Sequence, residues 1–441
     1  MQIAKCKLRI GTRPLPPVRC VAVLLLVCSW ASAACGEHPT TGSAETSSAA
    51  LVALKDYLAA DPKSRPPIAD QTFARTALAR EDAQSARRLL WEDHARRIRE
   101  SRAEEMKDRR LKDGQLVMPF YLQTFGDKPA TGRRLFISMH GGGNAPARVN
   151  DRQWENQKKL YQPEEGVYVA PRAPTNTWNL WHEPHIDRLF DRLIENLIVF
   201  EDVDPNRVYI LGYSAGGDGV YQLAPRMADR WAAAAMMAGH PNDALPLGLR
   251  NIGFTIHVGG RDAAYKRNEV AAEWEKKLDE LHQEDPGGYV HLVKIYPDKP
   301  HWLDREDAAA LPWMAKFVRN PVPNELVWKQ DDVTHRSFYW LAVDADQEKQ
   351  GTEIVASYHD QKVELQSADV TKVRVRLDDR MVDLDKPVTI IADGKQAFQG
   401  TVPRTIATLA QTLSERGDPA GIYCGEVEVT VPATSAPADG K

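Results

Sequence analysis

The chain has 441 residues, of which 43% are hydrophobic and 27% charged, and its formal net charge is −4 at pH 7. These values are ordinary for a soluble globular protein, and the length is enough for two domains with a sizeable core in at least one. A charge this small excludes binding of nucleic acid or of an anionic membrane through bulk electrostatics, so we expect no nucleic-acid partner.

Residues 1–33 have the pattern of a secretory signal peptide. Basic residues precede the apolar run VAVLLLVCSWASA, which closes on Ala31-Ser32-Ala33. The run is too short for a comfortable membrane-spanning helix. We therefore expect a secreted or periplasmic protein. An N-terminal membrane anchor is one alternative. Lipid attachment at Cys35 is another, although lipoprotein signals carry a branched apolar residue where this chain has Ser32.

The cysteines predict neither a disulfide framework nor a metal site. Only Cys35 and Cys424 follow the predicted signal peptide. Cys424 lies in GIYCGEVEV, so we expect a buried apolar side chain there rather than a ligand. No group of cysteines and histidines has zinc spacing. We expect no metal and no organic cofactor.

The segment before residue 113 divides into two parts. Residues 34–69 are predicted to be a linker, because 36–48 are small and polar. Residues 70–112 contain neither glycine nor proline and are rich in Ala, Arg, Glu and Leu, which predicts a helical segment of one or two helices.

Apolar runs and helical periodicity alternate from residue 113 to 320. This alternation predicts the α/β class, a mostly parallel sheet flanked by helices, and the nearly all-apolar strands suit a sheet covered on both faces. The expected strands are 115–125, 133–143, 166–174, 207–214, 231–239, 253–262 and 289–297, and the expected helices are 186–200, 215–228, 268–283 and 305–320.

Residues 324–431 are predicted to form a small, mostly β accessory domain. The stretches 372–377 and 425–431 read as strands, and Asp393-Gly394 predicts a hairpin between two further strand-like runs. A lone helix is expected over 404–416, and residues 432–441 are expected to be disordered. The domain either contacts a polysaccharide or a cell surface, or only supports the larger domain.

Four motifs follow apolar runs of the expected sheet, where the carboxyl ends of the strands meet and ligands bind. Alone, each has an ordinary explanation, as a glycine turn, a packing turn, a capping aspartate or a loop histidine. The last three motifs supply Ser, Asp and His in this chain order, which predicts a catalytic triad, and the first supplies a glycine-rich loop. The motifs are His140-Gly141-Gly142-Gly143 in FISMHGGGN, Ser214 in ILGYSAGGDG, Asp262 in HVGGRDAAY and His301 in YPDKPHWLD.

Each motif has a chemical role in this interpretation. Gly-x-Ser-x-Gly between a strand and a helix is a nucleophile elbow, so Ser214 is the predicted nucleophile. His301 is the predicted base, and Asp262 orients it. Asp243, one strand earlier, stays open as an alternative to Asp262, whereas Asp298 and Asp304 flank His301 too closely. The predicted oxyanion-hole amides are those of Gly141, Gly142, Gly143 and Ala215.

Residues 115–320 resemble the α/β-hydrolase superfamily of serine esterases on these motifs. The likeness is closest to polyhydroxybutyrate depolymerases, feruloyl and acetylxylan esterases and the phospholipase/carboxylesterase group. It implies an exported enzyme that cleaves carboxylic esters through an acyl-enzyme. The HGGGN motif departs from the glutamine-containing oxyanion motif of the polymer-degrading members, and the cysteines of their disulfides are nearly absent. These departures put a polymer substrate in doubt, and the choice between a polymer and a small-molecule ester stays open.

Aromatic residues near the motifs are predicted to bind the substrate. Trp178, Trp181 and Trp302 either line the substrate pocket or pack loops onto the core. The spacing of His182, Glu183 and His185 is poor for a metal site.

Three functions are compatible with these features. The leading one is a secreted serine hydrolase acting on an ester substrate. A serine peptidase of the same fold would share the triad, although no propeller domain accompanies it. A non-catalytic protein that binds glycan or a cell surface is the third, and the intact Ser-Asp-His set argues against it.

Overall fold

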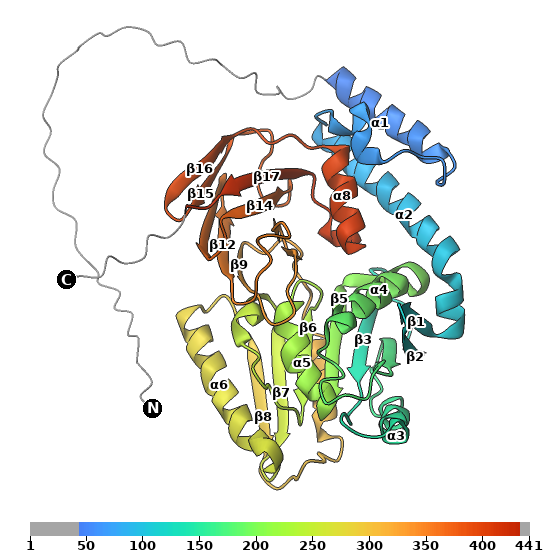
Figure 1. Cartoon of the computed structure of the whole chain (residues 1–441), viewed down its shortest axis with the longest axis vertical. Helices are drawn as coiled ribbons and strands as arrows, with labels where there is room; N and C mark the ends of the chain where they lie inside the picture. Colours follow the sequence, from blue (N-terminus) through green and yellow to red (C-terminus); the bar gives the residue numbers. More distant parts are fainter. Residues whose placement is uncertain (1–43, 433–441) are drawn as a thin grey trace, which may run out of the picture. The chain divides into compact units, whose positions relative to one another are not determined.

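The computed structural model describes residues 44–432, which all belong to one compact unit (Figure 1). The predicted signal peptide, Cys35 and residues 433–441 of the predicted tail lie outside the described residues. None of the described helices is long and apolar enough to span a bilayer.

A sheet of eight strands lies at the centre of residues 110–296. Its strands are β1 (Arg110–Asp113), β2 (Leu116–Phe125), β3 (Arg133–Met139), β4 (Gly166–Pro171), β5 (Val203–Tyr213), β6 (Ala233–Met237), β7 (Gly253–Gly259) and β8 (His291–Tyr296). They lie side by side in the order β1-β2-β4-β3-β5-β6-β7-β8. Strand β2 is antiparallel to β1 and β4, and the remaining neighbours pair in parallel.

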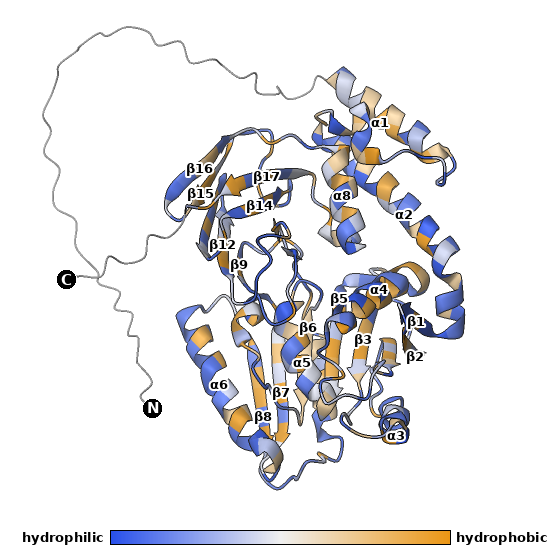
Figure 2. Cartoon of the chain, in the orientation of Figure 1, coloured by the Kyte–Doolittle hydropathy of each residue, from blue (hydrophilic) through white to orange (hydrophobic). Residues whose placement is uncertain are grey.

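The sheet is buried on both faces, as its apolar strands predict. Leu135 and Ile137 of β3 belong to one core cluster, whereas Phe136 between them belongs to another on the opposite face. Figure 2 shows β3 mostly in the hydrophobic colour, while α6 carries both colours. The flanking helices are α3 (Ala147–Gln157), α4 (Pro184–Glu201), α5 (Ala215–Arg226), α6 (Arg267–Glu284) and α7 (Ala310–Met314).

Two helices differ from the predictions. The helix expected over 305–320 is a 3₁₀ turn (Glu306–Ala309) followed by the short α7. Helix α7 ends at Met314, and further along the chain Arg319 donates its amide to the Asn206 carbonyl and its guanidinium to the Asn206 side chain instead of continuing the helix. Helix α3 was not predicted, because its sequence ARVNDRQWENQ is mostly polar and offers few apolar residues from which to recognise a buried face.

The N-terminal part is more regular than predicted. The linker prediction is wrong over residues 44–59, which form helix α1 (Ala44–Ala59). Ala50 and Leu54, one helical turn apart, are buried. They belong to the main core cluster, so α1 packs on the protein rather than connecting two parts of it. Helix α2 (Arg80–Asp108) accounts for most of the predicted helical segment.

The C-terminal part is mostly β, as predicted. Its two sheets have the orders β16-β15-β13-β12-β9 and β10-β11-β14-β17. Asp393 and Gly394 both have positive φ and turn the predicted hairpin between β15 and β16. The elements are β9 (Glu325–Lys329), β10 (Ser337–Phe338), β11 (Leu341–Ala342), β12 (Glu353–His359), β13 (Lys362–Ala368), β14 (Lys372–Leu377), β15 (Val388–Ala392), β16 (Lys395–Gly400), α8 (Ile406–Arg416) and β17 (Gly425–Thr430).

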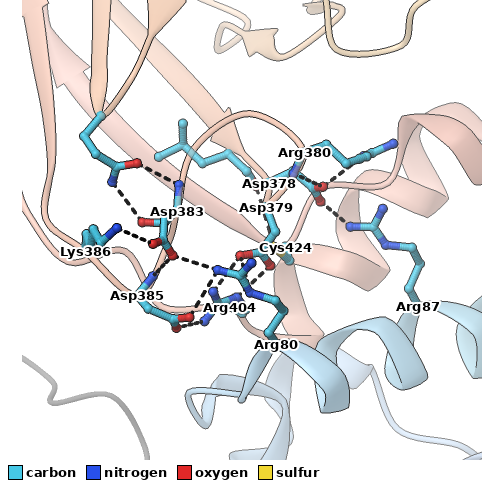
Figure 3. A network of polar contacts seen from close by, with 12 residues as sticks. Arg80, Arg87, Asp378, Asp379, Arg380, Asp383, Asp385, Lys386, Arg404 and Cys424 are labelled. Atoms are coloured by element: carbon cyan, nitrogen blue, oxygen red, sulfur yellow. Dashed lines mark hydrogen bonds and ion pairs between the residues drawn. The ribbon is translucent and has the colours of Figure 1, made fainter.

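Ion pairs join α2 to this C-terminal part (Figure 3). Arg87 pairs with Asp378, which is buried, and Arg80 pairs with Asp383 at 2.7 Å. Burial alone would raise the pKa of Asp378, but Arg380 and Arg87 hold it below its ordinary value. Cys424 is buried near these pairs, as predicted. The two ends of the described chain are therefore held together by charge pairs as well as by packing of α2 on α8.

The C-terminal part contacts the amino ends of the central strands. Tyr339 donates its hydroxyl to the carbonyl of Ala228, which precedes β6. Arg250, just before β7, bonds the carbonyl of Glu325 at 3.1 Å. Functional residues of such sheets lie at the opposite, carboxyl ends. The predicted α/β class is thus confirmed, with a mostly parallel sheet flanked by helices, an N-terminal helical segment and a C-terminal β part.

Candidate active site

Ser214 lies between β5 and α5 in a backbone conformation that few residues with side chains adopt. Its φ is 58° and its ψ is −120°. Residues held in such sparsely populated regions cluster at functional sites. The Ser214 amide donates to the Met237 carbonyl at 2.9 Å, which fixes the turn against β6. The sharp strand-to-helix turn expected of a nucleophile elbow is therefore present.

Glycine is required beside Ser214 because other backbone lies close by. A Cβ on Gly212 would lie 2.2 Å from the carbonyl oxygen of Gly216. A Cβ on Gly216 would lie 2.2 Å from the carbonyl oxygen of Met139. Close-packed interiors leave no room for such atoms without displacing the backbone. These glycines let the elbow pack directly on the end of β3, which leads into the HGGG loop.

Ser214, His301 and Asp262 form one continuous hydrogen-bonded chain. His301 Nδ1 lies 2.6 Å from Asp262 Oδ2, and His301 Nε2 lies 3.0 Å from Ser214 Oγ. Because an ionised carboxylate can only accept, Nδ1 carries the proton and Nε2 accepts the Ser214 hydroxyl proton. The structure thus brings together the three residues predicted as a triad.

Among the described residues, no other carboxylate bonds to the His301 ring. Asp243, the alternative acid, is exposed and accepts from Gln222 at 3.1 Å. Asp262 is buried, and the guanidinium of Arg267 lies 3.7 Å from its second oxygen. A buried carboxylate next to one cation and one imidazole is suited to stabilising an imidazolium.

Two side-chain contacts orient the peptides of the HGGG loop. Trp181 Nε1 donates to the His140 carbonyl at 2.8 Å, and His140 Nδ1 donates to the Gly141 carbonyl at 2.6 Å. Burial lowers the pKa of His140 to about 3, so the ring is neutral and its Nε2 accepts from the Ala173 amide. Since C=O and N–H of a trans peptide point in opposite directions, the Gly142 amide points away from the His140 ring.

One of the predicted oxyanion donors is wrong. The Gly143 amide donates to Asn150 Oδ1 at 2.9 Å and is not free for a substrate oxygen. Asn150 is buried and held in place by the Ala145 carbonyl and by Asn176. Gly142 lines the cavities beside Ser214, and Ala215 begins the helix that follows it. Gly142 and Ala215 therefore remain candidates. Gly141 lines the larger of these cavities, and its amide also stays a predicted donor.

Two cavities meet at Ser214. One, of about 490 Å³, extends past Trp178, Tyr265 and Asp218, and the other, of about 700 Å³, extends past Leu160 and Trp302. We call them the Trp178 arm and the Trp302 arm. Gly142, Ser214 and His301 line both. The two arms lie within the size range of ligand sites. A third hollow of about 660 Å³, next to α2 and α8, contains none of these residues.

The three predicted substrate-binding tryptophans do not share one environment. Trp178 is 59% exposed and Trp302 is 45% exposed, so both rings are accessible in the cleft. Trp181 is fully buried, supports the HGGG loop and lines neither arm, so its prediction as a substrate-binding residue is wrong. His182 and His185 are also buried, and burial lowers the pKa of both rings.

Sequence reasoning missed Asp218 and Asn150. Asp218 follows Ser214 by one helical turn, lines the Trp178 arm and accepts from the His240 amide at 2.6 Å. Burial raises the pKa of its carboxyl to about 6, only partly opposed by the His240 amide and Arg267. The elbow motif contained the signal for Asp218, an acid in the first turn of the helix. Nothing in the sequence indicated that Asn150 reaches the glycine loop.

Replacing Asp218 by asparagine is expected to stabilise the protein at neutral pH. The folded protein binds this proton more tightly than the unfolded chain does, so ionisation of Asp218 lowers stability as pH rises from about 4 to about 6. The Asp218→Asn variant should gain about 1–3 kcal/mol in unfolding free energy at pH 7 and nothing at pH 4. Urea unfolding at both pH values measures it. An equal change at both, or one matched by the exposed-site variant Asp298→Asn, would contradict this assignment.

No protein-family model matches this chain, and no curated protein matches it. A solved thermostable esterase aligns with 48% of this chain at 20% sequence identity and a TM-score of 0.38. The alignment covers 62% of the esterase, so this chain spans less than two thirds of that protein's length. The Staphylococcus aureus fluorophosphonate-binding serine hydrolase FphF aligns with 47% of this chain and 96% of its own, at 13% identity and a TM-score of 0.32. Porphyromonas gingivalis dipeptidyl peptidase 4 aligns with 47% of this chain and 34% of its own, at 15% identity and a TM-score of 0.34. With TM-scores below 0.5, these likenesses carry no conclusion about activity.

Proposed function

We propose that this protein is a serine hydrolase that cleaves carboxylic esters through an acyl-enzyme on Ser214. The observation that carries the proposal is the chain of hydrogen bonds from Ser214 Oγ through His301 to Asp262, at 3.0 and 2.6 Å. Nucleophile, base and orienting acid within hydrogen-bond reach are the signature of covalent acyl transfer.

The reaction follows from the roles of these atoms. Ser214 Oγ attacks the ester carbonyl while its proton moves to His301 Nε2, and Asp262 stabilises the imidazolium. The amides of Gly142 and Ala215 bind the developing oxyanion. His301 then protonates the departing alcohol. A water molecule, deprotonated by His301, attacks the acyl carbon, the acid leaves and the proton returns to Ser214.

A serine peptidase is the second candidate, because the same triad cleaves amides. We place the ester first because an alkoxide leaves a tetrahedral intermediate far more readily than an amide anion does. An amine can leave only after His301 has protonated its nitrogen, so an ester needs less assistance from this triad. Export, and contact of residues 324–431 with a polysaccharide or cell surface, stay predictions from the sequence.

We assign substrate binding to Trp178 and Trp302, one in each arm. The arms diverge from Ser214, and the two halves of an ester diverge from its carbonyl carbon. The geometry therefore suits binding of the acyl half in one arm and the alcohol half in the other.

A panel of esters tests both parts of the proposal. Nitrophenyl butyrate and the unactivated ester ethyl butyrate should both be hydrolysed, whereas a panel of short peptides should not be cleaved. Cleavage of a peptide with a kcat/KM comparable to that for ethyl butyrate would favour the peptidase. In a series of esters, either the acyl half or the alcohol half is enlarged while the other half is kept constant. Trp178→Ala should raise KM about 5- to 50-fold in one series, and Trp302→Ala should do so in the other. A response of both variants to the same side would contradict the two-arm assignment.

A further inference from the structure

The loop that carries His301 has no regular structure of its own. It runs from the end of β8 at Tyr296 to the 3₁₀ turn that begins at Glu306. The His301 side chain is 42% exposed, compared with 1% for that of Asp262. Fixing an irregular, half-exposed segment carries an entropic penalty, so a base held 3.0 Å from its nucleophile needs restraints beyond its contact with Asp262.

Tyr213 supplies such restraints from the residue next to Ser214. Its hydroxyl donates to the His301 carbonyl at 2.6 Å and accepts from the Leu303 amide at 3.0 Å. The side chain is buried, and its ring meets the His301 ring edge-on at 5.9 Å. One hydroxyl therefore binds the backbone on both sides of Trp302, at His301 and at Leu303. The first of these residues carries the predicted base.

Other tyrosines hold the same loop at different points. Tyr296 donates its hydroxyl to the Glu306 carbonyl at 3.0 Å, and Tyr161 bonds the carboxylate of Asp307. Neither bonds residue 301, and neither lies on the strand that carries Ser214. Of these three hydroxyls, that of Tyr213 alone joins the nucleophile elbow directly to His301.

We propose that Tyr213 is a positioning residue that sets the distance between His301 and Ser214 by tying the His301 backbone to the nucleophile elbow. This role rests on the proposed serine hydrolase function. A displacement of about 1 Å between reacting groups can lower a rate by about 100-fold, so a single hydrogen-bonded tether can matter for turnover. Tyr213 also lines the Trp302 arm, but its hydroxyl is occupied by the loop, so removing the hydroxyl keeps the ring that lines this arm.

The test is Tyr213→Phe, which keeps the ring and removes the hydroxyl. We expect kcat for nitrophenyl butyrate to fall about 10- to 100-fold with KM within about twofold. Titration with a fluorophosphonate counts the molecules able to react, so kcat is expressed per labelled molecule and a partly unfolded sample does not obscure the result. Labelling of the variant should reach the wild-type extent at a rate reduced by a similar factor.

The matched control is Tyr296→Phe, which removes one hydroxyl contact from the same loop, together with the 3.0 Å contact of that hydroxyl with His257 Nδ1, without touching His301. It should change kcat per labelled molecule by less than about threefold. Equal losses in the two variants, or an unchanged Tyr213→Phe, would overturn the proposal and leave Tyr213 as an ordinary buried side chain. Failure of the wild type to react with either reagent would instead overturn the proposed function, so the two failures are distinguishable.

Discussion

Replacing Ser214 by alanine should abolish ester hydrolysis and leave the fold intact. The change removes the attacking oxygen and the hydrogen bond to His301, while the backbone turn is still held by the Met237 carbonyl. Loss of a triad nucleophile lowers kcat by about 10⁴- to 10⁶-fold. Turnover of nitrophenyl acetate measures the loss, and circular dichroism verifies the fold. Peptide mapping after treatment with a fluorophosphonate should find the label on Ser214 in the wild type only.

The control for this variant is Ser101→Ala, on the exposed face of α2, where the hydroxyl only bonds the Arg97 carbonyl. It should keep wild-type turnover and labelling. Unchanged hydrolysis in Ser214→Ala would remove Ser214 as the nucleophile. Labelling at another residue, or none, would favour a binding protein on this fold.

Replacing Gly216 by alanine should damage both stability and turnover. The added Cβ would lie 2.2 Å from the Met139 carbonyl oxygen and 2.7 Å from its carbon, and neither is the end of a flexible side chain. Overpacking of this kind costs about 1–3 kcal/mol or more, and we expect about 3 kcal/mol here. Any relaxation moves the elbow away from the HGGG loop, so kcat should fall at least about 100-fold. Urea unfolding and kcat at saturating ester measure the two effects.

Gly287→Ala is the matched control, because a Cβ there meets its nearest atom at an ordinary 3.5 Å. Its unfolding free energy should change by less than about 1 kcal/mol, with kcat unaltered. If Gly216→Ala were as stable and active as this control, the close packing of the elbow on β3 would not be a requirement of the site.

The fold and the triad positions could be predicted because each depends on local patterns. Strand and helix periodicity indicated the parallel sheet, and the ends of its strands indicated where Ser214, Asp262 and His301 would meet. The amides of the HGGG loop could not be assigned this way. Gly143 differs from Gly142 only because Asn150 reaches its amide. Trp178 and Trp181 differ because one turn of loop exposes the first and buries the second.

The linker prediction failed for a related reason. Residues 36–48 are small and polar, which suggests flexibility, but Ala50 and Leu54 gain their burial from the folded protein and not from neighbours in sequence. The Tyr213 tether has the same origin, because its partners lie about 90 residues further along the chain. Contacts of this range are properties of the tertiary structure, and local patterns do not contain them.

The pairing of α2 with the C-terminal part has a consequence for biosynthesis. Arg87 and its partner Asp378 are separated by 291 residues, so α2 leaves the ribosome long before the residues it pairs with exist. At translation rates of 5–20 residues per second, roughly 15 to 60 s pass between the two. During that time the face of α2 that later packs on α8 is open to other proteins and to solvent. The nascent chain therefore passes through a stage in which α2 has been synthesised and α8 has not. A chaperone can bind the uncovered face of α2 during that interval.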